Sequence, residues 1–554
     1  MKPYPYYKTR PVGKIKDLIT YAYERTPEKD AFRVRVNKDS YRGISWRQFA
    51  GDVDALGTAL VSRGFKGKHI CVIGENCYEW VLTYLAVVCG VGVIVPLDKE
   101  QTKEKLLEHI RFADGQAVFF TKRYEAMMAE LQKELPGEML FVCMNNEDAA
   151  FTPLGALLAE GGRLVDGGDR SYLDAQVDNE SLAAILFTSG TSAESKGVML
   201  SHKNLIASFD GACKHVSYTE DDVMLSVLPL HHAYEMGCGI FAMLHTSTVV
   251  CFNENLKLFL SNLQLFQPTG MAIVPLIAET MYRQIMDGAR KKGKLKKLMF
   301  GMKLSNFLLK LGIDIREKLF AEVHEQLGGR LKKTVVGGSA MNPRLTAKFR
   351  ALGITMLHGY GITECAPLVA VNRERYYVDA STGPVLPVCE VKSVDGEIWV
   401  KGDNVMMGYY KNEKETAQAF SADGWFKTGD LGGVKDGFLH ITGRKKNLII
   451  LSSGENVSPE ELEEYIGELA AVKEVVVYAK NDVITAAVFP DPAYVETNGM
   501  EDVKALINNE IDTINKKLPM YKQVGSIVFR EEEFEKTTTN KIKRHQPIEE
   551  AQNV

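Results

Sequence analysis

Residues 183–200 have the sequence AAILFTSGTSAESKGVML, in which an apolar segment leads into a polar loop. The apolar residues 183–187 predict a short buried strand. The loop offers backbone N–H groups, hydroxyl groups and the ammonium group of Lys196, which are the donors that a polyphosphate needs. It is not a Walker A loop, because Ser195 precedes the lysine and Gly197 follows it. Such a cluster is more often an ordinary turn, so its interpretation depends on the rest of the chain.

Length and composition indicate a globular protein with more than one domain. The chain has 554 residues, 45% of them hydrophobic and 25% charged, which is too long for a single hydrophobic core. The formal net charge of -4 does not favour nucleic acid as a partner. The nine cysteines form no CxxC pair and their number is odd, which favours a reducing compartment over a disulfide framework or a zinc site.

The sequence shows no targeting or membrane-spanning pattern. The N-terminus, MKPYPYYKTR, lacks the apolar core of a signal peptide. The most apolar run, residues 81–97, is shorter than the ~20 residues of a spanning helix and is interrupted by Gly90, Gly92 and Pro96. We therefore expect a buried helix followed by a buried strand in this run, and a cytoplasmic protein.

Short apolar segments alternate with helical ones along the chain, which predicts an α/β fold with mostly parallel sheets. The expected strands lie at residues 69–74, 92–97, 117–120, 183–187, 222–227, 248–252 and 271–274, and a long helical signal covers 277–327. Residues 385–443 predict a β-rich subdomain of the same large N-terminal domain. A composition change at Arg444 predicts a small mobile α+β domain, so we expect domains at 1–443 and 444–554 with a hinge near Lys446.

Six motifs follow one another in an order that resembles the adenylate-forming synthetases. This superfamily contains acyl-CoA synthetases, adenylation domains of peptide synthetases and beetle luciferases. The motifs are the loop at 188–197, PLHH at 229–232, YGITE at 360–364, GWFKTGD at 424–430, GRKK at 443–446 and KIKR at 541–544. Two further stretches, GENCYEWVLTYLAVVCG at 74–90 and VPLDKE at 95–100, are most similar to long-chain fatty acid–CoA ligases. The resemblance covers nearly the whole chain.

The resemblance implies a reaction in two steps. A carboxylate attacks the α-phosphate of Mg²⁺-bound ATP to give an acyl-AMP and pyrophosphate, and the thiol of CoA then displaces AMP. A carboxylate is already ionised at neutral pH, so the first step needs no general base. It needs positioned reactants and stabilisation of the charge that develops on the phosphates. The expected cofactor and co-substrates are therefore Mg²⁺, ATP and CoA.

The resemblance also assigns residues of this chain, position by position. The residues matched to the nucleotide site are Thr188, Ser189, Gly190, Thr191, Ser192, Lys196, Gly338, Ser339, Ala340, Gly359, Tyr360, Gly361, Thr363, Asp430, Arg444 and Lys541. In this set Tyr360 would offer its ring to adenine, Asp430 would accept from the ribose hydroxyls and Thr363 would contact the α-phosphate. Glu364, with Thr191, would hold Mg²⁺, an ion that takes few protein ligands beside phosphate oxygens.

Four residues would act in the chemistry. They are Lys541, His232, Lys196 and Thr363. Lys541 would meet the charge on the bridging oxygen, a role that suits a compact ammonium group. His232 would border the carboxylate, although a core histidine is the competing explanation and His231 lies beside it. The loop departs from the family pattern at Ala193 and Ser195, which changes its stiffness more than its donors.

Segments of small and apolar residues predict which class of carboxylic acid the protein binds. The residues assigned to an acyl pocket are Tyr234, Gly237, Gly239, Val274 and Pro275. No cation is placed in these segments for the α-carboxylate of an amino acid. They favour a medium- to long-chain fatty acid, and an aryl acid stays open.

A basic segment suggests a second kind of contact. Residues 290–297, RKKGKLKK, hold six basic residues and lead into an apolar and basic stretch that ends near residue 310. A solvated helix is the commoner explanation of such a pattern. The alternative is a transient contact of residues 290–310 with the anionic inner face of a membrane.

Three other functions compete with that of a fatty acyl-CoA ligase. A stand-alone adenylation enzyme would load a separate carrier protein, and no fused carrier domain is visible. A luciferase-type oxygenase would share the first half-reaction. A catalytically inactive nucleotide-binding protein is disfavoured by the joint presence of Lys541, Glu364 and Asp430. The sequence does not predict the oligomeric state.

Overall fold

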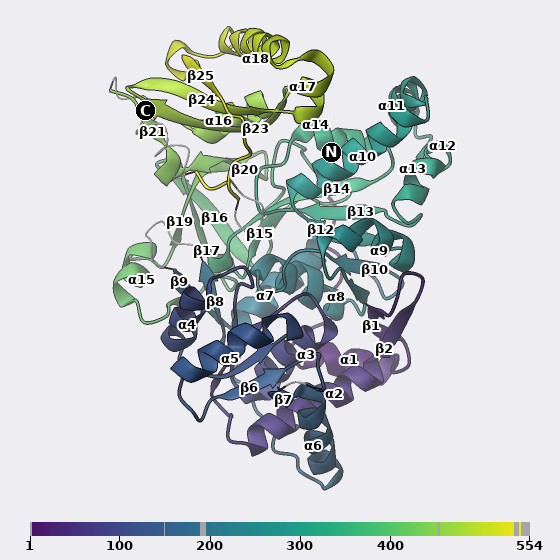
Figure 1. Ribbon diagram of the computed structural model, residues 1–554, viewed down its shortest axis with the longest axis vertical. Helices are drawn as coiled ribbons and strands as arrows, with labels where there is room; N and C mark the ends of the chain where they lie inside the picture. The colour runs from purple at the N-terminus through teal and green to yellow at the C-terminus, as the bar shows by residue number, and fades with distance from the viewer. Residues whose placement is uncertain (1–2, 149, 189–194, 453–454, 537–541, 545–554) are drawn as a thin grey trace. The chain divides into compact units, whose positions relative to one another are not determined.

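The computed structural model describes residues 3–148, 150–188, 195–452, 455–536 and 542–544. The chain forms two compact units (Figure 1). The first unit contains residues 1–390 and 400–426, and the second contains residues 391–399 and 427–554. The domain boundary at 443/444 stays a prediction, and so does the hinge near Lys446.

The first of two eight-stranded sheets in the first unit is mainly parallel. Its strand order is β15 (Leu368–Val371), β14 (Thr355–Gly361), β13 (Lys333–Val336), β12 (Gly270–Ile273), β10 (Val223–Ser226), β11 (Val249–Phe252), β1 (Asp30–Arg35) and β2 (Tyr41–Ser45). The strands from β14 to β1 are parallel to one another, and the edge strands β15 and β2 are antiparallel. The α/β fold and the strands expected at 222–227, 248–252 and 271–274 are confirmed.

The second sheet of the first unit contains the quoted stretch. Its order is β18 (Gly408–Tyr409), β9 (Lys196–Ser201), β8 (Leu182–Thr188), β4 (Val93–Pro96), β3 (His69–Ile73), β5 (Gly115–Phe120), β6 (Leu140–Cys143) and β7 (Thr152–Pro153). The strands expected at 69–74, 92–97, 117–120 and 183–187 are present as β3, β4, β5 and β8. Strand β9 was not expected. It is antiparallel to β8, from Leu182 paired with Ser201 to Thr188 paired with Lys196.

Helices accompany both sheets in the first unit. They are α1 (Asp17–Arg25), α2 (Trp46–Ser62), α3 (Tyr78–Ala86), α4 (Lys103–Phe112), α5 (Glu125–Glu134), α6 (Leu154–Asp166), α7 (His202–His215), α8 (Ala242–His245), α9 (Phe259–Phe266), α10 (Pro275–Lys291), α11 (Leu295–Lys310), α12 (Arg316–Leu319), α13 (Ala321–Gln326), α14 (Pro343–Ala351) and α15 (Glu413–Ala419). The apolar run at 81–97 is a buried helix, α3, that leads through a π-helical turn into β4, as expected. No helix among the described residues combines the length and the apolar character needed to span a bilayer.

The long helical signal at 277–327 corresponds to four helices, α10 to α13. Two of the breaks contain glycines with positive φ, +67° at Gly293 and +77° at Gly312. Glycine adopts this conformation without strain and commonly ends a helix. The buried side of α10 packs with α9, α14 and strands β10 to β14 in one core cluster that includes Leu225, Ile273 and Met281.

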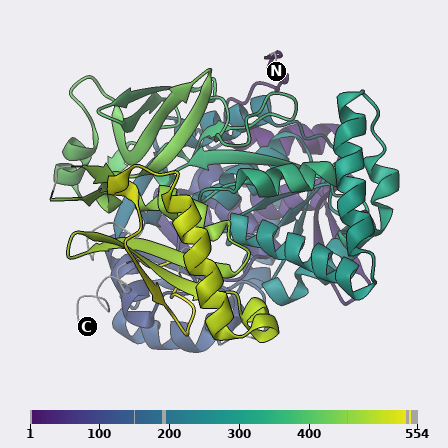
Figure 2. The same cartoon turned by 90° about the horizontal axis from the view of Figure 1, so that it is seen from above.

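The second unit contains two small sheets and most of a third. A four-stranded sheet has the order β16 (Cys389–Val394), β17 (Glu397–Gly402), β19 (Phe426–Lys435) and β20 (Phe438–Arg444). The others are β21 (Ile449–Ile450) with β22 (Asn456–Val457), and β23 (Val472–Lys480), β24 (Val483–Pro490) and β25 (Ser526–Phe529), accompanied by α16 (Pro459–Gly467), α17 (Pro492–Asn498) and α18 (Met500–Asn515). Figure 2 shows α18 along the three-stranded sheet, where Val503, Ile507 and Ile511 are buried in the core of this unit.

Candidate active site

The predicted residues of the first unit gather at one edge of its first sheet. Residues 229–232 follow β10, residues 274–275 follow β12, residues 338–340 follow β13 and residues 360–364 end β14. These four strands are parallel neighbours, so their carboxyl ends lie at the same edge. The carboxyl edge is where open α/β sheets bind ligands.

Tyr234 and the loop after β13 are in contact at this edge. The Tyr234 hydroxyl donates to the carbonyl of Val335 at 3.0 Å. A methyl group on Gly337 would approach the Tyr234 ring to 3.2 Å, and one on Gly338 would approach Val274 to 3.4 Å. Gly338 has a φ of +89°, which favours glycine. The structure thus brings together one residue assigned to the nucleotide, Gly338, and two assigned to the acid, Tyr234 and Val274.

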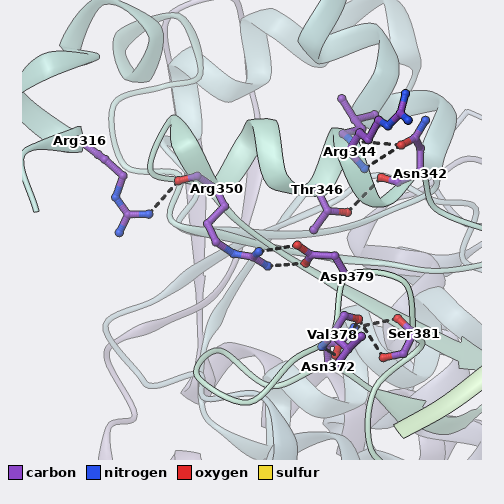
Figure 3. A network of polar contacts seen from close by, with 10 residues as sticks. Arg316, Asn342, Arg344, Thr346, Arg350, Asn372, Val378, Asp379 and Ser381 are labelled. Atoms are coloured by element: carbon purple, nitrogen blue, oxygen red, sulfur yellow. Dashed lines mark hydrogen bonds and ion pairs between the residues drawn. The ribbon is translucent and has the colours of Figure 1, made fainter. Parts of the chain in front are cut away.

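The loop at Gly338, Ser339 and Ala340 is exposed, but hydrogen bonds of His358 and Asn342 fix its surroundings. His358 of β14 is buried and hydrogen-bonds with backbone groups of Ser339 and Ser381, and burial lowers its pKa to about 4. Asn342 caps α14 by accepting from the Arg344 N–H at 2.8 Å (Figure 3). Figure 3 also shows Ser381 in contact with Asn372, whose amide donates to the Ser381 carbonyl at 2.9 Å.

The YGITE motif ends β14 with a β-bulge between Tyr360 and Gly361. A side chain at Gly361 would come within 2.3 Å of the Pro367 carbonyl oxygen, so the close pairing with the next strand requires glycine here. Gly359 pairs with Val371 in the same ladder. After the bulge, Thr363 and Glu364 lie in a short 3-10 turn and are partly exposed. Tyr360 is partly exposed as well.

Glu364 is oriented by a residue that the sequence did not single out. The Tyr409 hydroxyl donates to Glu364 Oε1 at 3.1 Å, and the Met406 N–H donates to the Glu364 carbonyl at 2.8 Å. Burial, and to a smaller extent the negative charge of Glu364, raises the pKa of Tyr409. Its hydroxyl therefore stays protonated and can donate a hydrogen bond. A fixed, partly exposed carboxylate oxygen fits the preference of Mg²⁺ for hard oxygen ligands.

Lys196 lies next to the same tyrosine. It pairs with Thr188 across the β8–β9 ladder. Its Nζ is 2.5 Å from Glu415 Oε2 and 5.0 Å from the centre of the Tyr409 ring. Tyr409 therefore contacts both the lysine assigned to the phosphates and the carboxylate assigned to the metal. The other loop residues assigned to the phosphates, Ser189, Gly190, Thr191 and Ser192, lie outside the described residues.

The histidine pair of PLHH is held by the two stretches that resemble fatty acid–CoA ligases. Asn76 is buried, donates to the Leu228 carbonyl at 2.7 Å and accepts from the Leu230 N–H at 3.2 Å. His231 Nε2 is 3.4 Å from Asp98 Oδ1. Burial lowers the pKa of His231 to about 3, so it is neutral at pH 7. The rings of His231 and His232 are 4.1 Å apart, and only His232 is assigned to the reaction.

The remaining acyl-pocket residues are packed closely. A methyl group on Gly237 would come within 2.9 Å of Pro367, and one on Gly239 within 2.5 Å of Glu235. Pro275 is buried at the first turn of α10. This close packing leaves no room for a side chain at either position, which explains why both are glycine. Their role in an acyl pocket stays a prediction.

The second unit contains the ribose residues. Asp430 and Arg444 face each other across β19 and β20, with Arg444 Nε 2.8 Å from Asp430 Oδ1. Asp430 is 2% exposed. The neighbouring Gly429 N–H donates to the buried carboxylate of Glu397 at 3.1 Å, and Glu397 also pairs with Lys445 at 2.9 Å. The pair is therefore formed inside the antiparallel ladder of β19 and β20, and burial lowers the pKa of Lys446, two residues after Arg444.

The C-terminal tail is anchored by residues that flank Lys541, which itself lies outside the described residues. Ile542 packs against a small cluster that includes Tyr478 and Phe534. Arg544 forms a bidentate pair with Glu463, at 2.6 and 2.7 Å. Burial raises the pKa of Glu463 to about 7.

Sequence reasoning missed four residues that support these positions. They are Asn76, Asp98, Tyr409 and Glu415. The first two lie in stretches already noted for their resemblance, so the signal was present without a role. Tyr409 lies within residues 385–443, which predicted only a β-rich subdomain. Glu415 lies on a surface helix and had no signal.

Comparison with known protein families gives matches along most of the chain. The model described as "AMP-binding enzyme" matches residues 19–410, and the one described as "AMP-binding enzyme C-terminal domain" matches residues 446–553. A curated relative, long-chain-fatty-acid–CoA ligase FadD15 of Mycobacterium bovis, is 28% identical over 480 residues, 83% of this chain and 79% of its own. Human long-chain-fatty-acid–CoA ligase 1 is 28% identical over 559 residues, 89% of this chain and 78% of its own.

Solved structures share the fold at lower identity. The anthranilate CoA ligase AuaEII, in complex with anthranoyl-AMP, has a TM-score of 0.79 at 18% identity and covers 100% of this chain and 99% of its own. ATP-bound MatB from Rhodopseudomonas palustris has a TM-score of 0.73 at 22% identity, with 97% and 98% covered. These likenesses confirm the fold.

Proposed function

Because this chain belongs to the AMP-binding enzyme family, we propose that it activates a medium- to long-chain fatty acid and transfers the acyl group to CoA. The chain is an enzyme of the acid–thiol ligase class that forms an adenylate. The contact of Tyr409 with both Lys196 and Glu364 carries the proposal. This contact supports a site in which Lys196 would bind phosphates beside Glu364, the proposed metal ligand.

In the first step a carboxylate oxygen of the acid bonds to the α-phosphorus of ATP, and the bond to the β-phosphate breaks. Lys196 binds the phosphates and leaves Glu415, while Tyr360 and the loop at Gly338 hold adenine. Mg²⁺ on Glu364 would neutralise part of the charge that develops on the leaving pyrophosphate. Lys541 would meet the bridging oxygen.

In the second step the sulfur of CoA bonds to the acyl carbon, and AMP leaves. We propose that the small domain, 444–554, rotates about Lys446 between the two steps, so that different faces of it meet the large domain, 1–443. Asp430 and Arg444 hold the ribose in both steps. His232 borders the acid and adjusts when the thiol arrives.

The fatty acid is proposed from two observations. The curated relatives that cover most of this chain are named long-chain-fatty-acid–CoA ligases. The site also places apolar Val274 and the ring of Tyr234 next to the loop at Gly338. The structural relative AuaEII is named for an aryl acid, and carboxylic acid reductase domains with a carrier protein share the fold, so both alternatives belong in the test.

A panel of acids from acetate to oleate, with benzoate and anthranilate, tests the proposal by ATP- and CoA-dependent formation of AMP. We expect the highest kcat/KM with a fatty acid of medium or long chain. Lys541→Ala should lower adenylate formation with this acid by about 100-fold, as loss of one charge-stabilising group does elsewhere. A preference for anthranilate, or transfer to a carrier protein but not to CoA, would overturn the assignment.

A further inference from the structure

Helix α11 carries an exposed stripe of alternating basic and apolar side chains. The residues of this stripe, here named the α11 ridge, are Lys296, Phe300, Lys303, Phe307, Lys310 and Leu311. The first five follow one another at three or four residues, which places them on one face of the helix, and Leu311, the C-cap, is four residues after Phe307. Phe300 is 68% exposed, Phe307 59% and Leu311 62%. Large apolar side chains in such a row are unusual on a surface that faces only water.

The opposite face of α11 holds the helix to the first unit. Met302 is buried in the core cluster with α10 and α14. The Ser305 hydroxyl is buried and donates to the Ala351 carbonyl, at the end of α14, at 2.9 Å. Gly301 lies so close to Phe320 that a methyl group would come within 3.2 Å of its ring. The helix is therefore fixed in rotation with the α11 ridge exposed. Figure 1 shows α11 at the edge of the first unit.

The charge around the α11 ridge has one sign. Residues 288–313 contain no Asp or Glu, and they contain Arg290, Lys291, Lys292, Lys294, Lys296, Lys297, Lys303 and Lys310. Lys292 and Lys294 pair with Glu322. Within the described part of the chain, no ion pair involves the lysines of the ridge itself. This local excess of cations contrasts with a chain whose net charge is -4.

We propose that the α11 ridge docks on the surface of a bilayer that contains anionic phospholipids. Lysines would stay among the head groups while the two phenylalanines and Leu311 enter the boundary of the acyl chains. A nucleic acid would satisfy the lysines, but aliphatic Leu311 and its exposed neighbour Ile313 would gain little from it. The docking needs neither ATP nor acid, so it goes beyond the proposed function.

Co-sedimentation of the full chain with vesicles tests this docking. We expect binding to phosphatidylcholine vesicles that contain phosphatidylglycerol, decreasing as salt rises, and little binding to phosphatidylcholine alone. The variant K296Q/K303Q/K310Q should partition onto the anionic vesicles about tenfold less, since each lysine near such a surface contributes to binding. The variant F300S/F307S/L311S should lose the binding that persists at high salt.

Matched variants control for charge and hydrophobicity elsewhere on the first unit. Lys38, Lys66 and Lys68 are exposed, so K38Q/K66Q/K68Q removes the same charge from another surface. Leu256→Ser removes a leucine that is 58% exposed, close to the value for Phe307. Both controls should bind like the unchanged protein. Equal losses in the controls and the ridge variants would overturn the docking site.

A spectroscopic measurement does not depend on loss of binding. In Phe300→Trp the new indole should be quenched by brominated phospholipids, relative to the four native tryptophans. Binding without this quenching would show that another surface faces the lipid. Binding of the unchanged protein to RNA but not to anionic vesicles would overturn the proposal in favour of a nucleic acid. Thioester formation measured without vesicles remains unaffected by either result, which separates the docking from the enzyme activity.

Discussion

In the first unit, Lys196 is held by an ion pair of its own ammonium group. In the second unit, an ion pair of Arg544 holds the segment that follows Lys541. Lys196 makes one contact with Glu415, whose side chain is 37% exposed. Arg544, three residues after Lys541, makes two contacts with Glu463, whose side chain is 16% exposed. The second pair is bidentate and more buried, so water competes with it less.

The difference separates a pair that can exchange from one that is permanent. If Lys196 binds phosphates, its resting partner must leave, and an exposed single contact is worth little. Arg544 has no assigned ligand, so its pair can be strong without opposing the reaction. If Lys196 binds ATP, its pair with Glu415 opposes that binding, whereas the pair of Arg544 with Glu463 does not.

Arg544→Ala should have the largest effect because it leaves the Glu463 carboxylate buried without its cation. Loss of one partner of such a pair destabilises by about 3 kcal/mol. Hydrogen exchange in β23 should report it, since the Val477 N–H donates to Glu463 at 2.6 Å. The exposed neighbour Lys543, 3.4 Å from Glu535, provides the control. Lys543→Ala should cost less than about 1 kcal/mol. Equal exchange in both variants would show that the Arg544 pair is not permanent.

Lys196→Ala should weaken the apparent affinity for ATP by about 10- to 100-fold, because a charge-assisted contact to phosphate is lost. Steady-state KM for ATP and direct titration of ATP measure it. Lys203 is a matched control, since it pairs with Glu180 and Asp403 at the surface. If Lys196→Ala changed the ATP affinity by no more than Lys203→Ala does, Glu415 would be the permanent partner of Lys196.

Tyr409→Phe should raise the Mg²⁺ concentration for half-maximal activity by about tenfold, as loss of a group that orients a metal ligand typically does. The variant keeps the ring beside Lys196 and removes only the donor to Glu364. Tyr410→Phe is the control, because Tyr410 donates to Asp114 instead, at 2.7 Å. An unchanged Mg²⁺ dependence would separate Glu364 from the metal.

These positions show what the sequence could and could not predict. Alternation of apolar segments predicted strands such as β3, β10 and β12, because buried parallel strands are apolar along their whole length. Strand β9 was missed because it begins at Lys196, where a polar loop was expected to end. Pairing across a ladder depends on the partner strand, which local pattern does not contain.

For the site, the resemblance assigns roles only where a motif contains the side chain itself, as for Glu364 and Asp430. The residues that orient these carboxylates come from distant segments. Tyr409 is 45 positions after Glu364, and only the fold brings the two together. Asn76 is 152 positions before the Leu228 carbonyl to which it donates. The roles of the motif residues rest on the resemblance and are tested by the variants proposed here.

Glu415 and Glu463 each have a cationic partner, whereas Glu235 is a buried carboxyl group for which no ion pair is found among the described residues. It is fully buried beside Gly239, and burial raises its pKa to about 8, although Ser226 and the Leu228 backbone lower it slightly. In the folded state it therefore holds a proton that the unfolded chain releases above pH ~4.5. Stability should be greatest below that pH and decrease as the pH rises through about 8. Glu235→Gln should raise Tm at pH 8 by roughly 2 °C or more and leave it unchanged at pH 4. A Tm difference independent of pH would assign the effect to packing.

Glu415→Gln should have the smallest effect and the opposite sign to the other site variants. Removing the charge that competes with phosphate for Lys196 should lower KM for ATP by about threefold, within the range of an exposed ion pair. The gain should vanish at high salt, which screens the pair in the unchanged protein. Glu413, in the same helix turn, gives a matched control in Glu413→Gln. The double variant K196A/E415Q should bind ATP no better than K196A, because the competing charge matters only through Lys196. Weaker ATP binding by Glu415→Gln alone would instead make Glu415 a residue that positions Lys196, and the distinction between an exchangeable and a permanent pair would fail.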